Sequence, residues 1–159
     1  MKKVVRVMLP LLFAATSFGQ STTVWHRIVG VITAPMVSNP VAGINSGGLP
    51  WTTSGGNATV NFTDGTVTFV VEGLVLVGGN ASGTPDGVTS VKGTLVCDPG
   101  ATDQVVVDTP TVPLSSQGNA AFSGQFEGPP PPATCAKPVF LVLASPANVW
   151  IATGAVREP

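Results

Sequence analysis

From residue 20 to the C-terminus, apolar and polar side chains alternate with a period of two, and this alternation is the feature that most restricts the fold. In the clearest case, Asp64-Gly65 joins two alternating runs, Ala58–Phe62 and Thr66–Glu72. Alternation is typical of strands with one buried face, and Asp-Gly between two such runs is a strong signal for a hairpin. The sequence therefore predicts a β-hairpin here, and no stretch after residue 20 sustains a helical period.

Further short strands are predicted on both sides of the hairpin. They are Val24–Ile32, Leu74–Val77, Thr89–Cys97, Gln104–Asp108, Asn119–Phe126, Val139–Ala144 and Val149–Ala155. About eight short strands separated by turn residues favour one antiparallel β-sandwich or barrel of the Ig-like or Greek-key type. We therefore expect a single all-β domain over residues 20–159, with residues 20–56 as a looser lead-in because Pro and Gly interrupt them often.

Residues 1–19 have the layout of a secretory signal peptide. A basic start precedes the apolar stretch Val7–Ala15 and the small or polar run Thr16–Gly19. The apolar stretch has about half of the ~20 residues that a membrane span needs. Cleavage after Gly19, or after Ser17, would leave an exported chain without a membrane span, either periplasmic or extracellular.

The charge content excludes several classes of partner. Charged residues make up 9% of the chain, against ~25% in an ordinary soluble domain. Without residues 1–19, four basic residues remain against eight acidic ones, a formal net charge of −4. Nucleic acids and anionic membranes attract clustered Lys and Arg, so neither is expected as a partner.

Cys97 and Cys135 are the only two cysteines. In an exported protein such a pair is predicted to form a disulfide, with two free thiols as the alternative. The disulfide would close a loop of 38 residues, which stabilises a fold by roughly 4 kcal/mol in the chain-entropy model.

Few residues could support catalysis, so we expect neither an enzyme nor a cofactor. His26 is the only histidine, and no Gly-x-Ser-x-Gly motif accompanies any serine. Glu72 and Glu127 lie in no recognisable cleft motif for glycoside hydrolysis. No metal site is predicted from Cys and His, because only His26 could join the two cysteines.

Loop aspartates leave calcium binding as an alternative. Asp98, Asp103 and Asp108 recur every five residues, and Asp86 lies in another loop. Calcium takes oxygen ligands from such loops, but Asp is also a common turn residue. The spacing lacks the dense Asp-x-Asp-x-Asp pattern, so a turn role is favoured.

One tryptophan is the candidate binding residue. Trp150 lies in an apolar strand and is predicted to be in the core, and Trp25 is ambiguous. Trp51 lies in a segment that reads as a loop, flanked by Thr and Ser, where its ring could stack on a sugar or anchor a protein partner. The alternative is that Trp51 caps one end of the sandwich.

A set of short motifs is spread over residues 40–156. They are Gly48–Trp51, Gly73–Leu76, Val96–Asp98, Val112–Ser115, Gly118–Ala120, Pro131–Cys135 and Val149–Gly154. The set resembles a group of small uncharacterised secreted bacterial proteins with a single paired-cysteine β domain. The resemblance implies the compartment and the fold, and it implies no activity. A weaker likeness to secreted CHRD-type domains lies in the hairpin layout, but their His-x-His segment is absent here.

These observations predict an exported, non-enzymatic β domain that binds a protein or a glycan at the cell surface. The alternative is a structural or self-associating cell-surface component that uses exposed strand edges. Size-exclusion of the mature chain at several concentrations distinguishes a stable monomer from a growing assembly.

Overall fold

The structure is a computed structural model, and it describes residues 22–158. The signal peptide predicted over residues 1–19 and its cleavage site lie outside the described residues. Within residues 22–158 there are eleven strands and no helix, so no helix there could span a membrane. The strands are β1 (Thr22–Gly30), β2 (Trp51–Thr52), β3 (Gly55–Asn61), β4 (Thr66–Glu72), β5 (Val75–Leu76), β6 (Ser90–Cys97), β7 (Val105–Asp108), β8 (Val112–Pro113), β9 (Ala120–Gln125), β10 (Val139–Ser145) and β11 (Val149–Glu158).

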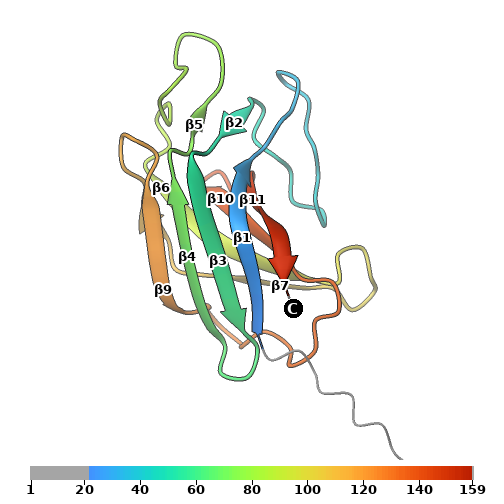
Figure 1. Cartoon of the computed structure of the whole chain (residues 1–159). Helices are drawn as coiled ribbons and strands as arrows, with labels where there is room; N and C mark the ends of the chain where they lie inside the picture. The colour runs from blue at the N-terminus through green and yellow to red at the C-terminus, as the bar shows by residue number, and fades with distance from the viewer. Residues whose placement is uncertain (1–21, 159) are drawn as a thin grey trace, which may run out of the picture.

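Nine of these strands form one antiparallel sheet. Its order is β7-β6-β10-β11-β1-β3-β4-β9, and β8 pairs with β6 beside this path. The sheet curls into a half-barrel, with β9, β4, β3 and β1 across the front of Figure 1 and β10 and β11 behind β1. Strands β2 and β5 form a small second sheet at one end. The predicted all-β antiparallel class is confirmed, in the form of an open, barrel-like curl.

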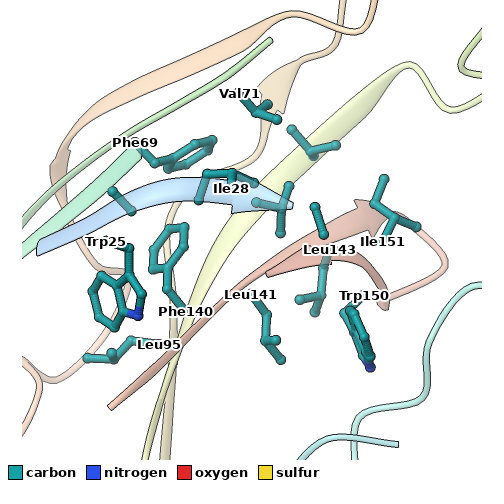
Figure 2. Close-up of a cluster of buried hydrophobic side chains, with 14 of the residues drawn as sticks. Trp25, Ile28, Phe69, Val71, Leu95, Phe140, Leu141, Leu143, Trp150 and Ile151 are labelled. Atoms are coloured by element: carbon teal, nitrogen blue, oxygen red, sulfur yellow. The ribbon is translucent and has the colours of Figure 1, made fainter. Parts of the chain in front are cut away.

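The curl brings aromatic side chains from both halves of the sheet together in one core. Phe140 on β10 lies 5.7 Å from Phe69 on β4 and 5.6 Å from Trp25 on β1, measured between ring centroids (Figure 2). Gly93 on β6 makes room for them, because a Cβ there would lie 2.7 Å from Phe140 and 3.0 Å from Phe69. The interior is therefore closely packed between the two halves.

The predicted hairpin is β3–β4, with Val60 opposite Val67. Asp64 Oδ1 accepts hydrogen bonds from the Thr66 hydroxyl at 2.7 Å and from the Thr66 N–H at 2.9 Å. These hydrogen bonds, that of the hydroxyl first, lower the pKa of the Asp64 carboxyl. Gly65 follows with a φ of 73°, a conformation that glycine adopts without steric cost.

Residues 20–56, predicted as a possible looser lead-in, include strand β1 and the connection that follows it. Strand β1 lies in the middle of the sheet, between β11 and β3. The connection after it is held by backbone hydrogen bonds from Val31 N–H to the Ile151 oxygen, from Gly47 N–H to the Trp150 oxygen and from Trp51 N–H to the Val31 oxygen, each 2.8–2.9 Å long. Pro and Gly here mark changes of chain direction, and hydrogen bonds to the sheet order the segment between them.

The predicted disulfide is confirmed. Cys97 ends β6, and Cys135 precedes β10, which pairs with β6. Both cysteines are buried. The bond therefore fastens the connection that contains Pro129–Pro132 to the end of strand β6, and a buried disulfide is typical of proteins in oxidising compartments.

Candidate functional site

The structure places Trp51, the predicted binding residue, in the core. It begins β2, where it pairs with Leu76 of β5, and it is only 6% exposed. Its ring face is therefore not available to stack on a sugar, and the stacking prediction is corrected. The sequence reads as a loop here because a two-residue strand is too short to show alternation. Trp51 still borders a groove on the surface.

Trp25 and Trp150 are also buried. The Trp150 indole Nε1–H donates a hydrogen bond of 2.8 Å to the Asn39 carbonyl oxygen, which satisfies the one polar atom of the ring. The core position predicted for Trp150 is confirmed, and the ambiguity over Trp25 is resolved in favour of the core.

The titratable side chains are dispersed. His26 Nε2 lies 3.0 Å from Glu158 Oε2 in an exposed pair between β1 and β11. Glu72 is exposed at the end of β4, and Glu127 is exposed after β9. Among residues 22–158 no group of three or more His, Cys, Asp or Glu side chains is placed to hold a metal ion.

The aspartates considered for calcium have separate roles. Asp108 accepts hydrogen bonds from Lys92 Nζ and from the Thr94 hydroxyl, both at 2.6 Å. Asp98 Oδ1 accepts one from the Lys137 N–H at 2.9 Å. Asp98 and Asp103 border one hollow together with Lys137, whereas Asp108 joins β7 to β6. The spacing of five residues therefore does not bring the three carboxylates together.

Exposed apolar side chains gather around β2, β5, the end of β1 and the connection after it. Strands β2 and β5 and the upper part of that connection lie at one end of the molecule, at the top of Figure 1. We call this surface the apolar rim. Its members are Val29, Ile32, Pro35, Met36, Val37, Leu49, Pro50 and Val77. Of the eight large hydrophobic side chains that are exposed in residues 22–158, six belong to it. The other two, Val106 and Val156, lie on β7 and β11.

Two shallow grooves run through the apolar rim. The first, of about 370 Å³, is lined by Val29, Ile32, Pro50 and Val77, among others. The second, of about 450 Å³, contains Pro50 and Val77 as well and continues to Leu49. Because they share two residues, the grooves form one continuous surface.

A tight turn projects from the rim. The Val37 N–H donates to the Ala34 carbonyl oxygen at 3.0 Å, with Pro35 and Met36 between them. Met36 has a φ of 64°, in the left-handed region where glycine or asparagine is preferred and other residues lose about 1–2 kcal/mol. Its side chain is 88% exposed, as is that of Ile32. Burial within this chain therefore does not compensate for the unfavourable backbone conformation.

Backbone hydrogen bonds hold the turn in place. The Met36 N–H donates to the Gly48 carbonyl oxygen at 2.8 Å, and the Thr33 hydroxyl donates to the Val37 carbonyl oxygen at 2.6 Å. An exposed apolar residue held in an unfavourable conformation is a feature of binding sites more than of stability.

The apolar rim comes from the uncharged part of the sequence. Residues 28–63 contain no Asp, Glu, Lys, Arg or His, and neither do residues 73–85. The charged residues that border these runs in the chain are Arg27, Asp64, Glu72 and Asp86. This long uncharged run is the sequence signal that could have indicated the rim, because it combines apolar residues with turn residues where no strand alternates.

Another hollow, of about 530 Å³, lies on the outer face of β4 and β9. Its lining includes Ser54, Glu72 and Asn119, and Asn119 Oδ1 accepts a hydrogen bond from the Gly73 N–H at 2.9 Å. It contains no exposed large apolar side chain, so the apolar rim is the stronger candidate for binding.

Comparisons with protein-family models, with curated proteins and with solved structures find no match to this chain.

Proposed function

We propose that this protein is an exported, non-enzymatic β domain that binds a macromolecular partner through the apolar rim. The observation that carries the proposal is the concentration of exposed large hydrophobic side chains at one end of the molecule. Contiguous apolar surface is uncommon on monomeric soluble proteins and marks interaction sites.

Export is supported by the buried disulfide and by the signal-like residues 1–19. An oxidising compartment, periplasmic or extracellular, keeps such a bond formed.

A binding role in preference to catalysis is supported by the chemistry of the rim. Its exposed side chains are aliphatic or Met and Pro, and Asp86 is the one ionisable side chain that lines its grooves, so no pair of an acid and a base is present there. The surface can exclude water from a partner and can hold it by dispersion and the hydrophobic effect.

The test is photo-crosslinking in the exporting cell. A photoreactive phenylalanine analogue is placed at Met36 in one strain and at Val156 in another. Val156 is a matched control because it is also an exposed apolar residue with positive φ, 52° against 64°, and it lies on β11 away from the rim. We expect a crosslinked product from position 36 and none from position 156. Equal products from both positions, or none from position 36, would contradict the proposal.

The same strains test export. The intact mass of the purified protein should correspond to a chain without residues 1–19 or 1–17. The mass of the full-length chain would contradict this part of the proposal.

A further inference from the structure

We infer that the partner on the apolar rim is a second copy of this chain, docked rim to rim about a twofold axis. The inference rests on the proposed function, because it assigns the occupant of the same surface. It is supported by the distribution of charge and by the shape of the rim.

The charge argument follows from symmetry. In a twofold contact the same patch occurs on both copies, so a charge near the axis meets its own duplicate and is repelled. The chain carries an excess of acidic residues after residue 19, four basic against eight acidic, and this net charge keeps most faces of two copies apart. Residues 28–63 and 73–85, which supply the rim, carry no charge, and Asp86 is the one charged residue that lines its grooves. The rim is therefore a surface on which two copies approach each other with little of this repulsion.

The shape argument follows from the turn and the grooves. The rim presents a projection, the turn that carries Met36, close to two hollows that share Pro50 and Val77. A projection and a hollow on one patch can complement the same patch on another copy, as a twofold contact requires. Insertion of Met36 would bury a flexible side chain that adapts well to an irregular apolar surface.

A lipid bilayer is the competing apolar partner, and the charges disfavour it. Apolar loops that insert into membranes are held by flanking Lys and Arg at the anionic headgroups. Residues 28–63 and 73–85 provide no cation and Arg27 is the one basic residue that borders them, so no cluster of cations flanks the rim, and the excess of acidic residues opposes approach to an anionic surface.

The experiment measures the mass of the purified mature protein by sedimentation equilibrium over a wide concentration range. The variants are Ile32→Asp and Met36→Asp, with Val156→Asp as the matched control. Each adds one negative charge at an exposed apolar position, and Asp tolerates the positive φ of Met36 and Val156 better than most residues do. Thermal melting of each variant confirms that it folds.

We expect a monomer–dimer equilibrium for the unaltered protein and for Val156→Asp. Each rim variant should raise the dissociation constant of the dimer by about tenfold or more, because two like charges then face each other. A monomer at every concentration would overturn the inference, as would dimers that all three variants leave unchanged. Flotation of the protein with phosphatidylcholine vesicles, lost in Met36→Asp, together with a monomer in solution, would overturn it in favour of a bilayer.

Crosslinking separates a failure of this inference from a failure of the proposed function. A product from position 36 with twice the mass of the chain supports both. A product of another mass, together with a monomer in solution, overturns the second copy and leaves the proposed function standing. Absence of any product and of any dimer overturns both.

Discussion

The core between the two halves of the sheet and the apolar rim both consist of apolar side chains, which are buried in the core and exposed at the rim. In the core, Gly93 leaves just enough room for Phe69 and Phe140, and all three are fully buried. At the rim, Ile32 and Met36 extend into solvent. The difference teaches that residue type alone does not determine whether an apolar side chain is buried in the fold or left in contact with solvent. Burial of the side chain depends on whether the curled sheet covers that position.

The largest expected effect lies in the core. Phe140→Ala should lower the free energy of unfolding by about 3–5 kcal/mol, because it removes a buried ring between Trp25 and Phe69. Urea denaturation of the mature protein measures the loss. A change below about 1 kcal/mol would mean that the two halves of the sheet are less closely packed than the structure indicates.

Removal of the disulfide is expected to cost somewhat less. Cys97→Ala combined with Cys135→Ala should lower the free energy of unfolding by about 2–4 kcal/mol, because the unfolded chain regains the freedom of the closed loop. The site lies at the end of β6, away from the apolar rim, so dimerisation of the folded protein should persist. A reducing agent should cause a similar loss in the unaltered protein and none in the variant, and a loss in both would show that the effect does not come from this bond.

At the rim, a substitution is expected to raise the free energy of unfolding instead of lowering it. Met36→Asn should raise the free energy of unfolding by about 0.5–1 kcal/mol, because Asn adopts positive φ more readily and no buried contact is lost. Thermal or urea denaturation measures the gain, and dimerisation should weaken at the same time.

Val37→Asn is the control for Met36→Asn, because Val37 is exposed and is not among the residues with positive φ. It should give no gain in stability. If Met36→Asn lowered the free energy of unfolding as much as a core substitution does, there would be no contrast between the rim and the core.

The smallest effect is expected at the exposed β3–β4 turn, which belongs to neither region. The pKa of the Asp64 carboxyl is lower in the folded protein than its ordinary value because Thr66 donates to it. A lowered folded pKa stabilises the fold above the unfolded pKa, and this contribution is lost as pH falls through the folded value. The loss therefore occurs below about pH 4.

Asp64→Asn should remove this acid-dependent component and leave the pH dependence between neutral pH and about pH 5 unchanged. Thermal melts of both proteins over the acid range measure it. Identical acid sensitivity in the two proteins would show that the turn contributes nothing to it.

Much of the fold could be predicted from the sequence, because local signals determine it. Alternation and Asp64-Gly65 predicted the β3–β4 hairpin, and the compartment implied by residues 1–19 predicted the pairing of Cys97 with Cys135. The two-residue strands β2 and β8 escaped prediction, because a period of two cannot be recognised in two residues.

The candidate site was harder to predict, because exposure depends on contacts between distant segments. Trp51 reads as a loop residue, yet its backbone pairs with Val31 and Leu76 and its ring enters the core. Met36 reads as one more apolar residue near a proline. Its exposure and positive φ follow from a turn that is held by Gly48, twelve residues later in the chain. Such distant pairings are not encoded in a local pattern.

The pairing of β1 with β11 joins the first and the last strands of the described chain in the middle of the sheet. A polypeptide that leaves a translocation channel from its N-terminus would present Thr22–Gly30 first and Val149–Glu158 last. Until the last strand arrives, the long edge of β1 has no neighbour on that side, and the two halves of the curl are not connected through it. In a chain exported in this way, completion of the sheet would be tied to the end of transport. Loss of the final strand by proteolysis would divide the sheet at its centre instead of removing an edge strand.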